Sequence, residues 1–395
     1  MKNLSVKALV IIFLMITFYL SLFADVPDLK VPELFNPIQD QYSKNYLNAS
    51  MAARGNTGIA IPDGINSAIY NPAAFRSDEN HFSFELLIKD VEKEFNTYNS
   101  TSRPRKEYHS PSALGFFGIG LSSYNNFHTG LSYSLVRSIE YNSFLRSLYG
   151  TGIVDTYPSY NEHQFTLTFN KQLGYLSVGL NNNIVIQSFT DYKNEGRVDK
   201  VDLSEAKYIP QVGILYEGNI LSLGGSYKPK VKNTLQEKYI SFDSVHPTTL
   251  SSGISLIPLQ DIRFSFDMDY TRYSEVSDYF DDQVSLKFGL EKLYKAFNFK
   301  IGFMHLPSVY EGEYLVYDYR GNDVSSFHPE FFNEIPQKGF YGDTTQNILT
   351  FGTTVNLFKT AKLSLAYLTD MSSNTNQTQF LCGLEIEFSA LKKVK

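Results

Sequence analysis

The sequence predicts an all-β protein: a transmembrane antiparallel up-and-down β-barrel of about 14 strands with an N-terminal plug (hatch) segment. Three observations predict this fold class. From residue 81 onward apolar and polar residues alternate with a period of two, the connections between these segments are long and short in turn, and the chain begins with a secretory signal. They divide the 395 residues into a signal peptide (1–24), a lead and plug (25–80) and a barrel with long external loops (81–395).

The first 24 residues have the features of an export signal. Lys2 and Lys7 precede the apolar run ALVIIFLMITFYLSLF, and Ala24 precedes the polar stretch DVPDLK. A basic start, an apolar core and a small residue at the break are typical of a cleaved signal, and an uncleaved anchor is the alternative. No cysteine lies near the break, so a lipoprotein is not predicted.

The alternating segments have the length of tilted membrane-spanning strands, roughly 9–11 residues. In DIRFSFDMDY, Ile262, Phe264 and Phe266 share one face, and Arg263 and Ser265 share the other. An even number of strands is what single-chain bacterial barrels require. The segments lie near 81–94, 113–123, 128–142, 163–173, 175–189, 208–217, 220–230, 248–257, 261–273, 282–291, 296–306, 346–358, 361–370 and 378–388.

The connections alternate in length along the chain. Long polar stretches such as DYKNEGRVDKVDLSEAK and VKNTLQEKYISFDSVHP follow odd-numbered segments, whereas Leu173-Gly174 and Gly218-Asn219 are examples of the short turns between them. This order places all long connections at one end, as in outer-membrane barrels. A soluble sandwich would also have two unlike faces, but it has no reason to keep this order. The longest connection, 307–345, contains YLVYDYRGNDVSSF, which is compatible with a hairpin over the barrel mouth.

Charged residues lie almost entirely on the face opposite the apolar one, which predicts a polar lumen. Arg137 and Arg272 share the apolar phase, and we expect their long side chains to reach the lipid headgroups. The residues predicted to face the lumen are Glu85, Lys89, Arg263, Asp267, Asp269, Lys287, Lys300, Glu385 and Glu387.

The last strand, FLCGLEIEF, resembles the recognition signal of the outer-membrane assembly machinery.

The stretch ASMAARGNTGIAIPDGINSAIYNPAAF, residues 49–75, precedes the first strand and is small, apolar and rich in turn residues. Pro72 disfavours helical backbone at Asn71. Asn71 is therefore predicted to cap a short helical turn that begins at Pro72 and continues through Ala73. Small residues that allow close packing are suited to filling a barrel interior.

The order A-R-G-x-x-G-I-A-x-x-D followed by S-A-I-Y-N-P-A resembles the plug of FadL-type outer-membrane transporters and of their PorV/PorQ relatives. The resemblance implies that Asp63, Ser67, Asn71, Pro72 and Ala73 are plug-motif residues. The alternative is that Asn71 and Pro72 only cap a short helix. The sequence departs from the family in having Ala74-Phe75 where Gly-Leu is usual.

For function, the resemblance implies a protein of the bacterial outer membrane that passes hydrophobic, fatty-acid-like molecules. It implies capture at external loops, a shift of the plug and lateral release through the wall, with SFLRSLYGTGI and FHPEFFNEI as aromatic capture segments. The alternative is a PorV/PorQ-like accessory barrel that binds a secreted protein in secretion or surface attachment. The expected partners are outer-membrane lipid, the barrel assembly machinery, and either a hydrophobic small molecule or a secreted protein.

Several classes of function are not predicted. A net charge of −6 does not favour nucleic-acid binding, and no Gly-rich phosphate loop or Cys/His cluster with metal spacing occurs. We therefore predict no cofactor, no metal site, no catalytic residue and no enzymatic activity, and no individual ligand-binding residue can be named. The single cysteine, Cys382, alternates in phase with Phe380 and Leu384, which favours an apolar structural role.

Overall fold

The computed structural model describes residues 43–76, 79–95, 105–109, 112–123, 125–140, 144–148, 152–156, 159–192, 200–237, 240–276, 280–309, 345–358, 360–372 and 375–388. The predicted signal peptide, most of the lead and the C-terminal tail lie outside this range. Within the described part of the chain, no helix is both long enough and apolar enough to cross a membrane.

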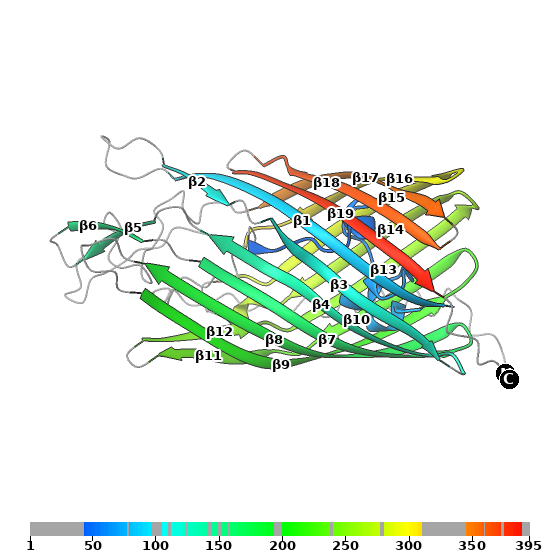
Figure 1. Cartoon of the computed structure of the whole chain (residues 1–395), viewed down its shortest axis with the longest axis horizontal. Coiled ribbons are helices and arrows are strands. Elements are labelled where there is room, and N and C mark those ends of the chain that lie inside the picture. The colour runs from blue at the N-terminus through cyan, green and yellow to red at the C-terminus, as the bar shows by residue number, and fades with distance from the viewer. Residues whose placement is uncertain are drawn as a thin grey trace.

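The strands close into a barrel, as predicted (Figure 1). Each wall strand pairs antiparallel with its neighbours, and β19 pairs with β1 from Asn80↔Phe388 to Lys93↔Thr375. Closure removes the sheet edges that hydrocarbon would leave without hydrogen-bond partners. The fourteen described wall strands are β1 (Asn80–Phe95), β3 (Ser112–Ser123), β4 (Phe127–Glu140), β7 (Ser159–Leu173), β8 (Leu176–Tyr192), β9 (Lys200–Glu217), β10 (Leu221–Lys228), β13 (Thr249–Leu259), β14 (Ile262–Thr271), β15 (Gln283–Tyr294), β16 (Phe297–Leu306), β17 (Gln346–Phe358), β18 (Ala361–Asp370) and β19 (Thr375–Phe388).

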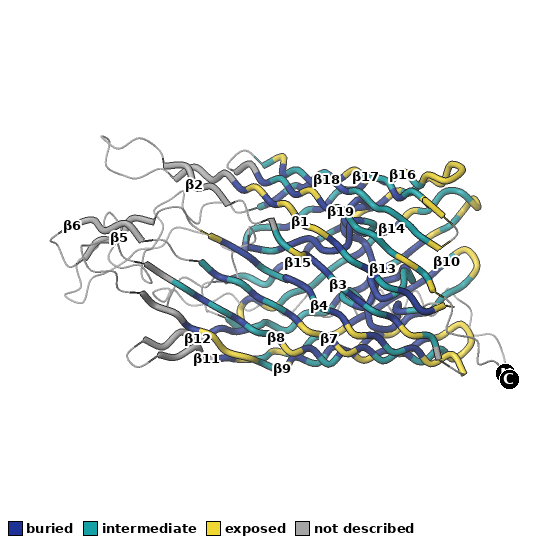
Figure 2. Tube along the Cα trace, in the orientation of Figure 1, coloured by how far each residue is buried: buried dark blue, intermediate teal, exposed yellow. Residues whose placement is uncertain are grey.

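The two faces of the wall differ as the alternation predicts. In β7, the side chains of Thr166 and Thr168 are buried in the interior, whereas Phe165 and Leu167 are 44% and 43% exposed on the outside. Figure 2 shows this change from residue to residue along most strands. Glu85 and Lys287, predicted to face the lumen, are also buried. The wall therefore has an apolar outer face suited to lipid and a polar inner face.

The short connections lie at one end of the barrel and the long ones at the other (Figure 1). Several long connections carry strands that the sequence prediction treated as loops, because their residues lack a clear apolar face. They are β2 (Arg105–His109), which extends the pairing of β1, and the hairpins β5 (Phe144–Leu148) with β6 (Gly152–Thr156) and β11 (Val231–Glu237) with β12 (Ile240–His246). The strand predicted from residue 208 begins earlier, at Lys200. Most of the connection 307–345, with its predicted hairpin, lies outside the described residues.

Residues 43–76, here called the inner segment, lie inside the barrel (Figures 1 and 2). They contain the short helix α2 (Ala49–Ala52) and the 3-10 turns η2 (Asn66–Ile69) and η3 (Pro72–Ala74). Met51, Ile65 and Phe75 have no exposed surface. Small and apolar side chains therefore fill the lumen at this level.

Candidate functional site: the inner segment and the luminal cavity

The turn at Asn71 has the predicted local geometry. Asn71 is extended (φ −146°, ψ 111°), and its Oδ1 accepts a hydrogen bond from the Ala73 backbone N–H at 3.0 Å. Pro72 occupies the first position of η3, where its missing N–H costs nothing. Asn71 does more than cap the turn, because its Nδ2 donates to the carbonyls of Ile59 (2.8 Å) and of Ile214 in the wall strand β9 (3.0 Å).

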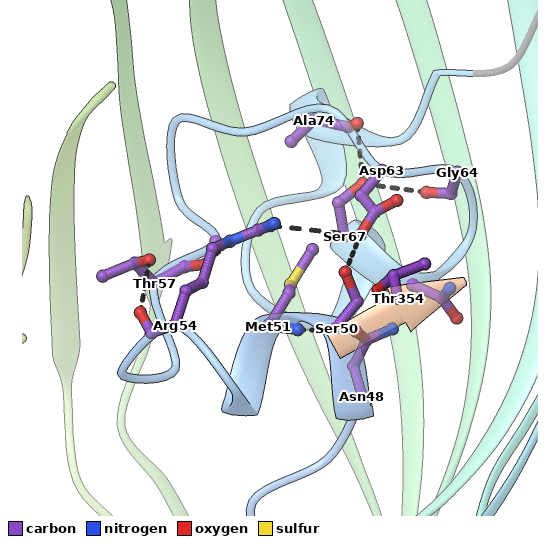
Figure 3. A network of polar contacts seen from close by, with 12 residues as sticks. Asn48, Ser50, Met51, Arg54, Thr57, Asp63, Gly64, Ser67, Ala74 and Thr354 are labelled. Atoms are coloured by element: carbon purple, nitrogen blue, oxygen red, sulfur yellow. Dashed lines mark hydrogen bonds and ion pairs between the residues drawn. The ribbon is translucent and has the colours of Figure 1, made fainter. Parts of the chain in front are cut away.

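Ser67 and Asp63 stabilise different parts of the inner segment (Figure 3). The Ser67 hydroxyl lies 2.7 Å from the carbonyl oxygen of Ala74 and 2.8 Å from that of Gly64, so it ties η2 to η3. Asp63 instead accepts a hydrogen bond from Ser50 at 3.3 Å and lies 3.9 Å from the guanidinium of Arg54. The structure thus brings Ser67 to the turn at Asn71 but places Asp63 in a separate ionic network.

The wall approaches the inner segment closely at several glycines. A Cβ atom on Gly302 would lie 1.9 Å from the backbone nitrogen of Gly55, and one on Gly213 would lie 2.0 Å from Oδ1 of Asn71. A Cβ on Gly179 would also clash with η3. No side chain fits at these distances, so the inner segment and the wall form one packed unit.

Carboxylates of the wall bind backbone N–H groups of the inner segment. Oδ2 of Asp267 accepts from Gly58 at 2.7 Å and from Ile59 at 3.0 Å. Glu85 accepts from the backbone N–H groups of Asn48, at 2.7 Å, and of Ala49, at the start of α2. These hydrogen bonds fix the inner segment to opposite parts of the wall.

A cavity of about 220 Å³ lies above the inner segment, on the side of the long connections. Four basic residues line it (Lys44, Arg137, Lys228 and Lys287) together with two carboxylates (Glu162 and Asp269), an excess of two positive charges when Lys44 is protonated and His246 is neutral. The rest of the lining is mixed: apolar side chains, including Leu47, Val136 and Ile209, lie beside polar ones such as Gln164 and Gln211. The cavity can therefore take a molecule with an anionic group and an apolar body.

The electrostatics of the cavity follow from burial. Burial, together with the nearby charge of Lys287, lowers the pKa of the Lys44 amine to about 7. Burial and the Glu85 carboxylate raise the pKa of the Tyr70 hydroxyl, which keeps this cavity residue neutral. Asp269 is paired with Lys287, whereas neutral His246, 3.2 Å from Glu162, leaves the charge of that carboxylate in place. The charges of Lys44, Arg137 and Lys228 therefore exceed that of Glu162 by two when Lys44 is protonated.

The wall beside the cavity has an interruption in its hydrogen-bond ladder, here called the ladder gap. A bulge at Gly115 shifts the register of β3 against β1, between Glu85↔Phe116 and Leu86↔Leu114. The pairing of β3 with β4 ends at Phe116↔Ser134. Residues 112–115 of β3 and 135–140 of β4 therefore do not pair with each other.

Arg137 corrects one expectation. The alternation placed it on the apolar face with its side chain reaching the headgroups, but it lines the cavity and donates to Ser43 at 2.9 Å. The reason is a bulge at Val136, since Leu135 pairs with His163 and Arg137 with Glu162. One extra residue reverses the faces of the strand beyond it. Sequence reasoning also missed Lys44 and Lys228, which carry no local signal of their position.

Comparison with solved structures gives confident matches over nearly the whole chain. A Pseudomonas aeruginosa FadL homologue matches with a TM-score of 0.63 at 11% identity, over 91% of this chain and 100% of that chain. The Ralstonia pickettii toluene transporter TbuX matches with a TM-score of 0.59 at 15% identity, over 90% and 99% of the two chains. The Pseudomonas putida toluene transporter TodX matches with a TM-score of 0.62 at 14% identity, over 86% and 98%.

The chain has the fold of the FadL-type outer-membrane transporters. No family model matches the sequence, and no curated protein matches it. The FadL-type fold is thus recognised through structure, at identities where sequence similarity alone is weak. Its closed antiparallel wall is the fold class that the alternation and the order of connections predict.

Proposed function

We propose that this FadL-type barrel lies in the bacterial outer membrane and passes hydrophobic small molecules that carry an anionic group. The observation that carries the proposal is the cavity with an excess of two positive charges, which borders the ladder gap. A carboxylate would lie near Lys44, Arg137 and Lys228, and an acyl chain would pack on Leu47, Val136 and Ile209. The FadL homologue and toluene transporters of the same fold support transport as the general activity.

The inner segment would act as the plug that closes the axial path. Its buried residues and its close contacts with Gly213 and Gly302 support this role. Single-channel conductance of the intact protein, compared with a variant lacking residues 47–75, tests it. Equal conductance of the two proteins would refute the plug role.

Uptake by cells that lack transporters of this type tests the substrate class. We expect radiolabelled palmitate to enter cells that produce this protein faster than control cells. Lys228→Glu, which reverses one cavity charge, is expected to reduce palmitate binding at least tenfold. Lys295→Glu is the matched control, because Lys295 is exposed in the turn between β15 and β16, far from the residues that line the cavity. Palmitate binding that is equal in both variants would refute the anionic site.

The accessory-barrel alternative is not favoured, because the similar structures reported above are transporters. We also infer no enzymatic activity from these relatives. Mass spectrometry of small molecules that co-purify with the protein separates the two functions. A secreted protein retained in place of any lipid or acid would overturn the transport proposal.

A further inference from the structure

A long apolar groove lies on the outer face of the wall, over β13 to β17, and has a volume of about 440 Å³. One side of the groove is a row of side chains that face each other across neighbouring strands. Phe266 pairs with Phe288, Phe288 with Phe303, and Phe303 with Leu349. The ring centroids of Phe266 and Phe288 are 4.9 Å apart, so these side chains form a continuous ridge.

The other side of the groove lies two residues nearer to the short turns. There Phe264 pairs with Leu290, and Leu290 with Ile301. Between the two rows the floor includes the backbone of Gly289 and Gly302, and the inner segment lies directly behind these glycines. The groove is therefore an apolar channel on the lipid side of the wall, opposite the attachment of the inner segment.

The described parts of the chain leave the groove uncovered. Phe264 is 49% exposed, Phe288 46% and Ile301 41%. In an outer-membrane barrel this face of the wall lies against hydrocarbon, so membrane lipid contacts the groove. From β13 to β17 the groove crosses four spacings between strands, about 19 Å at about 4.8 Å each. A long and narrow apolar channel fits a linear acyl chain.

The groove runs at a slant toward the short turns, because the strands are tilted against the long axis of the barrel (Figure 1). Phe264 lies two residues after Ile262, where β14 begins, whereas Leu349 lies nine residues before Phe358, where β17 ends. The β14 end of the groove is therefore the end nearest to the membrane boundary on the side of the short turns, where lipid headgroups lie.

An ion pair lies at this end of the groove. Lys292 follows Leu290 by two residues, so it shares the outer face of β15, and it pairs in register with Ile262. Its amine binds the carboxylate of Asp261, in the turn before β14, and the two side chains are 47% and 45% exposed. A cation beside an anion complements a headgroup that carries a phosphate next to an ammonium group. Asp261 would repel a headgroup that is only anionic.

We propose that the groove binds an acyl chain of phosphatidylethanolamine, with the headgroup phosphate at Lys292 and the headgroup ammonium at Asp261. The lipid site does not depend on the proposed transport function, since the groove faces the membrane whereas the cavity lies inside the barrel.

Fluorescence quenching by brominated lipids tests the site. The chain contains no tryptophan, so a single introduced tryptophan reports only on its own surroundings. Phe288→Trp is the test protein, and Phe165→Trp, on the outer face of β7, is the matched control, because Phe165 is 44% exposed. Each protein is placed in vesicles of equal parts phosphatidylethanolamine and phosphatidylglycerol, with bromine on the acyl chains of one lipid or of the other. We expect brominated phosphatidylethanolamine to quench the test protein at least twofold more than brominated phosphatidylglycerol, and the two lipids to quench the control equally.

A second substitution tests the headgroup assignment. In the Phe288→Trp protein, Asp261→Lys leaves two cations at the end of the groove, so phosphatidylglycerol should become the stronger quencher by at least twofold. Asn219→Lys also places a lysine in an exposed short turn, between β9 and β10, and should leave the preference for phosphatidylethanolamine unchanged.

Two results would overturn the proposal. Equal quenching of the test protein by the two lipids means that the groove contacts only bulk lipid. Quenching of the control but not of the test protein means that a protein, such as a second copy of this chain, covers the groove. Phe264→Trp, at the β14 end of the groove, should give the same lipid preference as Phe288→Trp.

Discussion

Substitutions at Asn71 test whether its side chain only caps the short helical turn or also attaches that turn to the wall. Its side chain is fully buried and makes three hydrogen bonds, one to the Ala73 N–H and two to the carbonyls of Ile59 and Ile214. The first bond is the cap. The other two join the turn to the rest of the inner segment and to β9.

Two substitutions separate these roles. Asn71→Ala removes all three bonds, and at about 1 kcal/mol each the local stability falls by about 3 kcal/mol. Asn71→Asp keeps the acceptor for the Ala73 N–H but turns a carboxylate oxygen toward two carbonyl oxygens. It loses about 2 kcal/mol of hydrogen bonding and also buries an unpaired charge, which adds a further cost. Asn71→Asp should therefore be at least as disruptive as Asn71→Ala.

A pure cap predicts the reverse order, because Asn and Asp cap helices about equally well and Ala does so poorly. Hydrogen exchange of the peptide covering residues 65–76 measures the local stability, and the heat-dependent gel mobility of the folded barrel shows that the wall is intact. Asn126→Asp is the control, because Asn126 is exposed in the turn before β4. If Asn71→Asp exchanges like the unmodified protein while Asn71→Ala does not, the attachment role is wrong.

Three further changes test other parts of the site. Glu85→Gln should destabilise the start of α2 by about 1–3 kcal/mol, because an amide has one acceptor oxygen for two backbone N–H groups, and faster exchange of the first amides of α2 would show it. Gly302→Ala places a Cβ 1.9 Å from the backbone nitrogen of Gly55, so it should displace the inner segment and raise channel conductance. Gly383→Ala is the control: the atom nearest to its Cβ is 3.4 Å away, so conductance should stay the same. Because the pKa of Lys44 is about 7, its amine loses its charge as pH rises from 6 to 8. Binding of hexadecanesulfonate, which stays ionised, should therefore weaken by up to about tenfold per pH unit above 7. Lys44→Gln should make this binding less dependent on pH, and a pH profile equal to that of the unmodified protein would contradict the role of Lys44.

The wall was predictable from sequence because its signal is local. The segments predicted at 346–358 and 361–370 have the same bounds as β17 and β18. In each, lipid on one side and the lumen on the other impose a period of two on neighbouring residues. The turn at Asn71 was predictable for a similar reason, because proline restricts the residue before it.

What the sequence could not give depends on contacts between distant residues. The bulge at Val136 adds one residue to a regular alternation, and nothing near Arg137 indicates that its side chain faces the cavity. The strands β11 and β12 carry no apolar face that would mark them as strands. Similarly, the bridge between Lys44 and Arg137 joins the inner segment to a strand far along the chain, with no pattern in either stretch.

The inner segment is held firmly both at its start and around the turn at Asn71. Displacing the part around Asn71 would break bonds to β9 and lose the packing against Gly213 and Gly302 together. Releasing residues 43–46 would break bonds to β4, Lys89 and Gln379, and it would also take Tyr46, which is 1% exposed, out of the core cluster that it shares with Ala49 and Leu87. Because the loss of a buried aromatic side chain alone costs about 3–5 kcal/mol, a ligand that displaces either part must bind the displaced state more tightly than the closed one by at least that amount.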